Sequence, residues 1–151
     1  IDRFKSINDN FGHAVGDRVL AIFAEAARKS MRGSDLIGRF GGDEFAAMLL
    51  ETNREKAIEV AERIRASFAQ MTQDVDGHQV GATVSIGLVH SLERTLDIPE
   101  LLAQADHALY CAKERGRNRV EVASLDMLLE RREQGTTRGL GAAALVAKSP
   151  A

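Results

Sequence analysis

Apolar residues recur at three- and four-residue intervals in three stretches of the chain, and this spacing predicts three helices that each bury one face. The predicted helices cover residues 15–31, 52–71 and 97–116. Thr52 followed three residues later by Glu55 has the form of a capping box. Pro99 stands in the first turn of the third helix, and Gly116 is expected to end it.

Shorter apolar runs without helical spacing predict strands. They cover residues 36–40, 45–50, 79–89 and 119–122. Gly41-Gly42 separates the first two runs, which predicts a β-hairpin. Asp74 to Gly77 has the composition of a turn, and Gly87 inside the third run indicates a bulge or the close approach of another backbone.

The predicted order is helix, strand, strand, helix, strand, helix, strand. This alternation gives an α/β or α+β sheet with helices packed on it. We predict one domain over residues 1–122. Beyond Val122 the chain has no core pattern, although residues 125–132 could form a short helix. Residues 123–151 are therefore predicted to be a C-terminal tail or linker.

Composition narrows the class of protein. The 151 residues are 44% hydrophobic and 28% charged, which suits one globular domain. A formal charge of −2 argues against a domain that coats a nucleic-acid polymer through bulk charge. A single cysteine, Cys111, excludes an intrachain disulfide and a multi-cysteine zinc site, which favours a reducing, cytoplasmic compartment.

Targeting signals are not visible in the pattern. No apolar run reaches the roughly 20 residues that span a bilayer, and the opening Ile-Asp-Arg-Phe-Lys does not have the order of a signal peptide. The sequence does not open on Met. We therefore expect it to be a fragment of a longer protein.

The segment Gly41-Gly42-Asp43-Glu44 concentrates candidate chemistry at the tip of the predicted hairpin. Two glycines let the backbone turn tightly and approach a ligand without Cβ atoms. Strand side chains alternate, so at least one of the two carboxylates is expected to face solvent. By itself the segment could equally be a polar turn with solvated acids.

Residues 1–17 are dense in Asp, Asn, His, Lys and Gly. An EF-hand loop does not fit, because its acids and amides must alternate and a closing Glu is missing from residues 6–17. Asn8 and Asp17 could instead read guanine, since carboxylate and amide oxygens accept from its N–H groups and the amide NH₂ can donate to O6. The plainer interpretation makes Asn8 a turn residue and Asp17 a helix cap.

Lys113 and Arg117 lie at the end of the third predicted helix. They could act as macrodipole partners or as a cationic clamp for phosphates.

Together, in this order and at this spacing, the segments FKSINDNFGHAVGD, RFGGDEF, VSIGL and ADHALYCAKERGRNRV resemble the GGDEF family of diguanylate cyclases. The resemblance runs from Ile1 to Val122. It implies a palm-like fold: a central, mostly antiparallel sheet flanked by helices, similar to adenylyl cyclase catalytic domains. It also implies condensation of two GTP molecules into cyclic di-GMP with release of two pyrophosphates.

By position, the resemblance implies that Asn8 and Asp17 read guanine and that His13 lies in the same nucleotide-contacting segment. Phe4 and Lys5 match the turn that meets the phosphates, with Lys5 placed to steady charge on the transferring group.

The resemblance also implies roles in the reaction. Asp43 matches the metal-binding acid of the motif and Glu44 matches its neighbour, and one of the two is expected to help deprotonate the attacking 3′-hydroxyl. Lys113 and Arg117 resemble the pair that holds the terminal phosphates. The chemistry is in-line phosphoryl transfer assisted by metal ions.

The implied metal site takes Asp43, the backbone of Ile1 and a first acid, two residues before Asp2, that is absent from this sequence. A strand that leads into this acid, central to the family's sheet, is also expected before Ile1. Losing it would expose two sheet edges, so we expect residues 1–151 alone to be poorly stable and weakly active. Mg²⁺ is the expected cofactor, with Mn²⁺ as the alternative.

Arg32 and Asp35 match the RxxD inhibitory site of the family, where cyclic di-GMP binds. The resemblance implies that Arg32 forks onto a guanine edge or a phosphate while Asp35 takes guanine N–H groups. Such a pair by itself is usually a surface ion pair that contributes little to stability. Arg63 or Arg65 is expected as a second contact.

The implied partners are GTP, cyclic di-GMP and a second protomer, since each protomer of a homodimer would hold one GTP. An upstream sensory domain is expected in the parent protein, which could be membrane-anchored upstream. The alternative function is a catalytically inactive module that binds GTP or cyclic di-GMP as a sensor. Another palm-type nucleotidyl cyclase is more remote.

Overall fold

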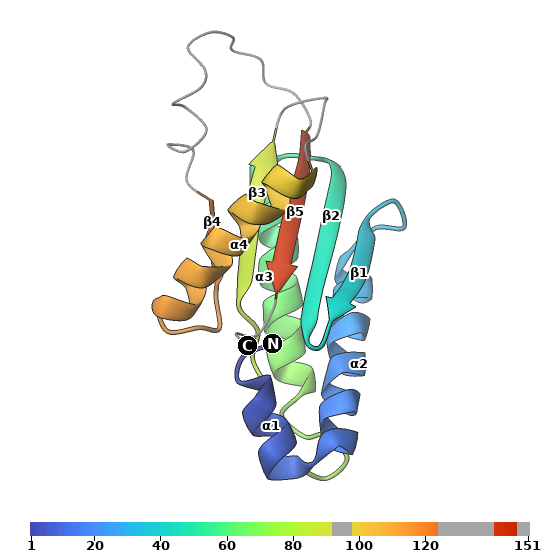
Figure 1. Cartoon of the computed structure of the whole chain (residues 1–151). Helices are drawn as coiled ribbons and strands as arrows, with labels where there is room; N and C mark the ends of the chain where they lie inside the picture. Colours follow the sequence, from blue (N-terminus) through green and yellow to red (C-terminus); the bar gives the residue numbers. More distant parts are fainter. Residues whose placement is uncertain (92–97, 124–140, 148–151) are drawn as a thin grey trace, which may run out of the picture.

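The structure is a computed structural model that describes residues 1–91, 98–123 and 141–147. Figure 1 shows the elements in chain order. They are α1 (Phe4–Phe11), α2 (His13–Ser30), β1 (Leu36–Gly41), β2 (Glu44–Thr52), α3 (Arg54–Met71), β3 (Ile86–Ser91), α4 (Ile98–Glu114), β4 (Val120–Val122) and β5 (Gly141–Ala147).

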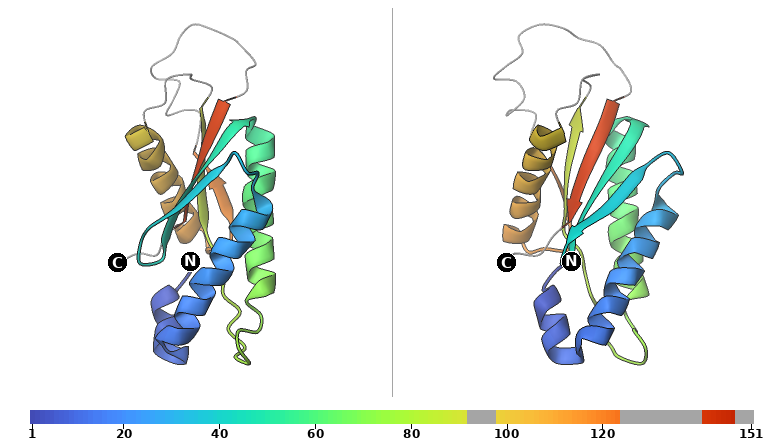
Figure 2. Two further views of the ribbon diagram at one scale, coloured as in Figure 1. Left: turned by 90° about the vertical axis from the view of Figure 1, so that its right-hand side faces the viewer. Right: turned by 45° about the vertical axis from the view of Figure 1, so that its right-hand side comes forward.

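The described residues form a five-stranded sheet in the order β1-β2-β5-β3-β4. Three of the four pairings are antiparallel, and only β3 and β4 run parallel. Helices α2 and α3 lie on one face of the sheet and α4 on the other (Figure 2). The predicted α/β architecture with a central, mostly antiparallel sheet is confirmed.

A separate core forms on each face of the sheet. On the α2–α3 face the rings of Phe23, Phe45 and Phe68 meet, with Phe23 4.6 Å from Phe45 and 5.4 Å from Phe68 between ring centroids. On the α4 face, Gly87 allows the close approach that the sequence predicts. A methyl group at Gly87 would lie 2.0 Å from the carbonyl oxygen of Ala105 in α4, so only glycine fits between strand and helix.

The prediction of a C-terminal tail is wrong for residues 141–147, which form β5 between β2 and β3. The strand is buried on both faces, with Ala144 and Val146 toward α4 and Leu145 toward α3. A strand covered on both sides is apolar throughout and lacks the alternation that marks a half-buried one. The expected pair of open edges in the middle of the sheet is therefore also wrong.

Several other boundaries differ from the predictions. Helix α1 is absent from the predicted elements, because Ser, Asn and Asp dominate it and only Ile7 is buried. Helix α3 is capped by Asn53, whose Oδ1 accepts from the Lys56 N–H at 2.8 Å, and not by the box that begins at Thr52. Asp97, the expected start of the third helix, and residues 125–132 lie outside the described residues.

The strand predicted over 79–89 begins only at Ile86. Gly81 has a positive φ of 62°, and its N–H bonds to the carbonyl of Thr72. Thr83 and Ser85 direct their hydroxyls to Asp2. These local bonds replace a strand ladder. Within the described residues, no helix combines the length and apolar character needed to cross a membrane.

Candidate active site

The β1–β2 turn, the start of the chain and the end of α4 meet at one end of the sheet (Figure 1). The backbone nitrogen of Ile1 lies 3.5 Å from Oδ2 of Asp43. The two predicted metal-site residues, Ile1 and Asp43, are therefore neighbours.

Asp43 is buried at the turn, whereas Glu44 is half-buried. The turn is shaped by Gly42, which has a positive φ of 44° and whose carbonyl accepts from the Nε of Arg39 at 2.7 Å. This geometry turns the Asp43 side chain inward, so Glu44 is the more exposed of the two acids.

The surroundings of one buried carboxylate oxygen indicate whether the site suits a divalent cation. Asp43 Oδ2 accepts no hydrogen bond from the described residues, and the Ile1 nitrogen lies 3.5 Å from it. An incompletely paired buried anionic oxygen is costly. Carboxylate and carbonyl oxygens are the ligands that Mg²⁺ and Mn²⁺ take. In the described ranges no group of three His, Cys, Asp or Glu side chains gathers. Asp43 beside the Ile1 backbone therefore fits part of a metal ligand set.

The predicted guanine readers lie where α1 and α2 pack together. Asn8 is in the middle of α1 and Asp17 is inside α2, so neither is the turn residue or helix cap of the plainer interpretation. A methyl group at Gly16 would lie 1.9 Å from Asn8 Oδ1 and 3.4 Å from the ring of Phe4. Glycine at this position leaves room for the Asn8 amide.

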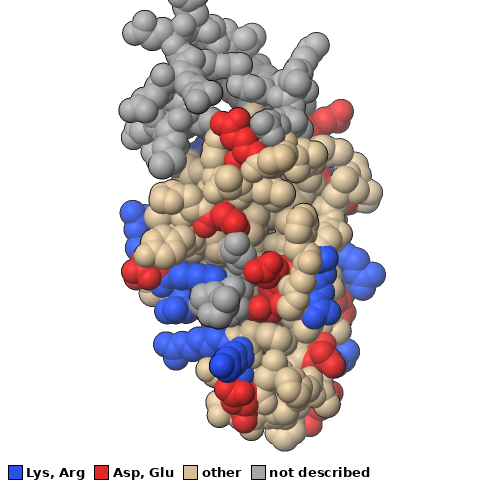
Figure 3. Space-filling view, viewed as in Figure 1, with Lys and Arg blue, Asp and Glu red and all other residues tan. Residues whose placement is uncertain are grey.

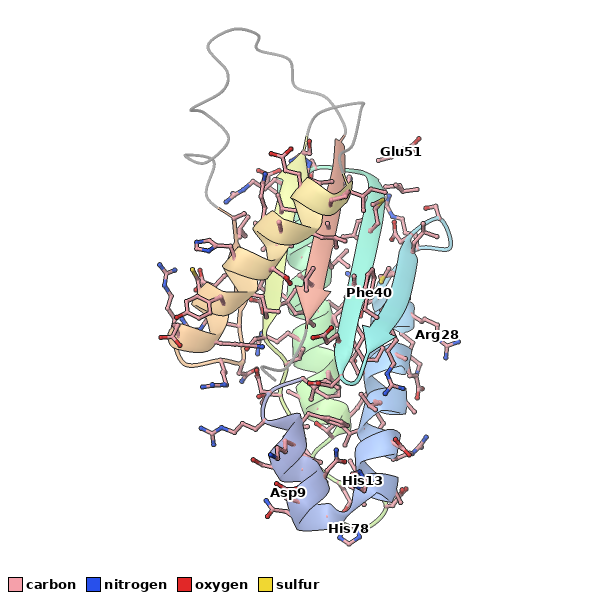
Figure 4. The ribbon with its side chains drawn as sticks, viewed as in Figure 1. Asp9, His13, Arg28, Phe40, Glu51 and His78 are labelled. Atoms are coloured by element: carbon pink, nitrogen blue, oxygen red, sulfur yellow. The ribbon has the colours of Figure 1, made fainter. Side chains whose placement is uncertain are left out.

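Asn8 Oδ1 is the second buried acceptor without a partner among the described residues. The other predicted nucleotide contacts differ in position. Lys5 is exposed on the first turn of α1. His13 begins α2 and lies near Asp9 and His78 at the end of the α1–α2 pair remote from the hairpin (Figure 4).

The predicted phosphate ligands occupy the end of α4 and the turn that follows. Lys113 is in the last turn of α4. Arg117 has a positive φ of 63°, and its N–H bonds to the carbonyl of Ala112 at 3.0 Å. Basic side chains gather where α4 ends and α1 begins, and acidic ones lie beside them toward the hairpin (Figure 3). Basic and acidic side chains thus lie beside one another at this end of the sheet.

Sequence reasoning missed Asp2 as a site residue. Its side chain is buried and accepts from Thr83 Oγ1 at 2.8 Å, Ser85 Oγ at 2.7 Å and the Asn118 N–H at 3.1 Å. The alternation of Thr83 and Ser85 on one side of an extended segment was the available signal. Two hydroxyls facing the same way in a buried segment need a polar partner.

Arg32 and Asp35 lie at the opposite end of β1 from the hairpin turn. They line a hollow of about 170 Å³. Asp35 Oδ2 accepts from the Arg32 N–H at 2.8 Å and Oδ1 from the Leu50 N–H at 3.3 Å. Of the two further arginines, Arg63 lines this hollow and bonds to the Ser30 carbonyl. Arg65 bonds instead to Asn118, on the active-site side.

The model of the diguanylate cyclase GGDEF domain matches residues 1–119 of the chain. The chain belongs to the GGDEF family. It is 43% identical over 124 residues to the probable diguanylate cyclase DgcT of Escherichia coli, which covers 81% of this chain and 27% of DgcT. It is 43% identical over 123 residues to the diguanylate cyclase DgcP of Pseudomonas aeruginosa, covering 82% of this chain and 18% of DgcP.

This GGDEF domain therefore spans about a quarter or less of those two curated relatives. Solved structures agree with its fold. The GGDEF domain of YfiN from P. aeruginosa is 40% identical with a TM-score of 0.71, covering 82% of this chain and 78% of that one. The GGDEF domain of DgcB from Caulobacter crescentus, in complex with c-di-GMP, is 31% identical with a TM-score of 0.75, covering 82% and 73%.

Proposed function

We propose that this GGDEF domain is a diguanylate cyclase that condenses two GTP molecules into cyclic di-GMP and two pyrophosphates. The observation that carries the proposal is a pair of buried acceptors, Asn8 Oδ1 and Asp43 Oδ2, that accept no hydrogen bond from the described residues. One suits the N–H groups of guanine and the other suits a divalent cation. A substrate with a guanine at one end and a metal-bound triphosphate at the other matches both.

The nucleotide would lie along α1. Asn8 and Asp17 hold the guanine edge, with Phe4 beside them and His13 farther along the same segment. Lys5, Lys113 and Arg117 neutralise the phosphates. Asp43 and the Ile1 backbone would hold Mg²⁺ or Mn²⁺, which when bound lowers the pKa of the attacking hydroxyl and neutralises charge on the α-phosphate.

The chemistry needs two protomers, because each holds one GTP. The 3′-oxygen of one nucleotide forms a bond to the α-phosphorus of the other, and the bond from that phosphorus to the β-phosphate bridging oxygen breaks. Of the two acids, Glu44 is the more exposed, and we assign it the role of accepting the hydroxyl proton. Repetition in the opposite direction closes the ring and releases the second pyrophosphate. Because GTP is the substrate, we place the domain in the cytoplasm.

Product regulation is the second part of the proposal. Cyclic di-GMP would bind in the hollow lined by Arg32, Asp35 and Arg63, with arginine forks on its guanines or phosphates. The hollow lies away from the reacting end of the sheet, so inhibition there would act through the fold or by holding protomers apart.

The test incubates the natural full-length protein, and residues 1–151 beside it, with GTP and Mg²⁺, and follows cyclic di-GMP by chromatography. The control is the double variant Asp43→Ala with Glu44→Ala. Product that disappears in the control supports the cyclase. If no product forms but GTP or cyclic di-GMP still binds, the domain would be a sensor module and not a cyclase.

A further inference from the structure

A hydrogen-bond network joins the start of the chain to the turn that carries Arg117. Asp2 Oδ2 accepts from the backbone N–H of Asn118 at 3.1 Å. Asn118 Oδ1 accepts from Nη1 of Arg65 at 2.9 Å, and Nε of Arg65 also bonds to Glu62 at 2.7 Å. The turn after α4 is therefore held from two sides, by the N-terminal segment and by α3.

The backbone of this turn is unusual. Gly116, Arg117 and Asn118 follow one another with positive φ values of 107°, 63° and 45°. Non-glycine residues adopt this region uncommonly, and an arginine there needs surrounding contacts to stay. Arg117 donates its own N–H to the Ala112 carbonyl at 3.0 Å and accepts at its carbonyl from Arg119 Nε at 3.3 Å. The contacts that tie the turn to Asp2 and to α3 are those of its neighbour Asn118. Without the Asn118 contacts, only these local bonds would oppose relaxation of the turn, and the guanidinium of Arg117 would move with its backbone.

Asp2 fixes the other end of the network. Thr83 and Ser85 donate their hydroxyls to its carboxylate, and its own N–H bonds to the Thr83 carbonyl at 2.9 Å. Asp2 directly follows Ile1, which lies beside Asp43. One buried carboxylate thus sets the spacing between the acid that would hold the metal and the turn that would hold the terminal phosphates.

We propose that Asp2, Asn118 and Arg65 are positioning residues that hold Arg117 at the distance from Asp43 that a metal-bound triphosphate requires. This proposal rests on the proposed function, and deepens it by assigning three residues that touch neither guanine nor phosphate. Changing these residues should weaken binding of the triphosphate. Binding of the guanosine end should be unchanged, because Asn8 and Asp17, which would bind it, lie on α1 and α2.

The test measures by calorimetry, with Mg²⁺ present, the affinity for a non-hydrolysable GTP analogue and for GMP. The main variants are Asn118→Gly, which keeps the positive φ but removes the acceptor, and Arg65→Met. Arg54→Met, on the exposed first turn of the same helix, is the matched control. Asp2→Asn is a supplementary variant and does not decide the test, because Asp2 adjoins a residue of the metal site and the variant protein could fail to fold.

We expect the two main variants to lower the affinity for the GTP analogue by about tenfold to a hundredfold, the range for a misplaced substrate-holding group. Their affinity for GMP should stay within about twofold of wild type. Joining Asn118→Gly to Arg117→Ala should cost no more than Arg117→Ala alone. Equal losses for analogue and GMP, unchanged affinities, or additive losses would overturn the positioning role. Wild-type protein that binds neither ligand would remove the proposed function, and this proposal with it.

Discussion

The two candidate ligand sites of this domain differ in how complete they are without a ligand. At the hairpin end, Asn8 Oδ1 and Asp43 Oδ2 are buried and accept no hydrogen bond from the described residues. At the opposite end, both oxygens of Asp35 accept from backbone N–H groups, and Arg63 bonds to the Ser30 carbonyl.

This difference indicates two kinds of binding. Buried acceptors without donors are costly in the free protein, so a ligand that supplies N–H groups and a cation would relieve that cost. The Arg32–Asp35 hollow is already held in shape by its own hydrogen bonds, so its ligand would add to a preformed site. Substitutions at the hairpin end should therefore have the larger effects.

The largest expected effect comes from Asp43→Asn. The variant keeps the size of the side chain but removes the charge that would hold the metal, so the rate of cyclic di-GMP formation should fall by about a thousandfold. The concentration of Mg²⁺ needed for half-maximal rate should rise. Steady-state assays across an Mg²⁺ series measure both.

Glu55→Gln is the matched control for lost negative charge, because Glu55 is exposed at the start of α3. Its rate should stay within about twofold of wild type. An Asp43→Asn variant with an unchanged Mg²⁺ requirement would remove Asp43 from the metal site and weaken the contrast between the two ends.

The sequence predicts much of the site but not what holds it together. Asp43 and Asn8 stand out because their motifs are local, each within a few consecutive residues. Asp2 is not predicted, because its partners Thr83 and Asn118 are 81 and 116 positions away. Hydrogen bonds between such distant residues leave no periodic trace in a single sequence.

The fold shows the same limit. Helices α2, α3 and α4 follow from their apolar stripes, and the β1–β2 hairpin follows from its glycine pair. Strand β5 does not, since its residues are small and apolar and its place is defined only by pairing with Phe45 to Leu49 on one side and residues 87–91 on the other. It also lies beyond the 119 residues that match the family.

An intermediate effect is expected from Gly16→Ala. The added methyl group would meet Asn8 Oδ1 at 1.9 Å, so the amide must leave the position where it would read guanine. The KM for GTP should rise by about tenfold to a hundredfold, with a smaller change in kcat, because a substrate-holding group is displaced. Competition between GTP and inosine triphosphate measures the accompanying loss of discrimination for the guanine amino group.

Gly38→Ala is the control for this prediction, because a methyl group there meets nothing within 4 Å. It should leave KM and the preference for GTP near wild type. If Gly16→Ala behaved like Gly38→Ala, Asn8 would have no part in reading guanine.

The smallest expected effect separates two arginines on one helix. Arg63 lines the hollow with Arg32 and Asp35, whereas Arg65 bonds to Asn118 on the active-site side. Arg63→Met should weaken cyclic di-GMP binding about tenfold, the value of one charge-assisted hydrogen bond, and Arg65→Met should leave it within about twofold. Calorimetry with cyclic di-GMP tests both variants. For the triphosphate analogue, the larger loss of affinity is expected for Arg65→Met, because Arg65 bonds to Asn118 beside Arg117. Two arginines separated by less than one helical turn would then serve opposite ends of the sheet. Equal losses of cyclic di-GMP affinity in the two variants would instead mean that the two sites are coupled through α3.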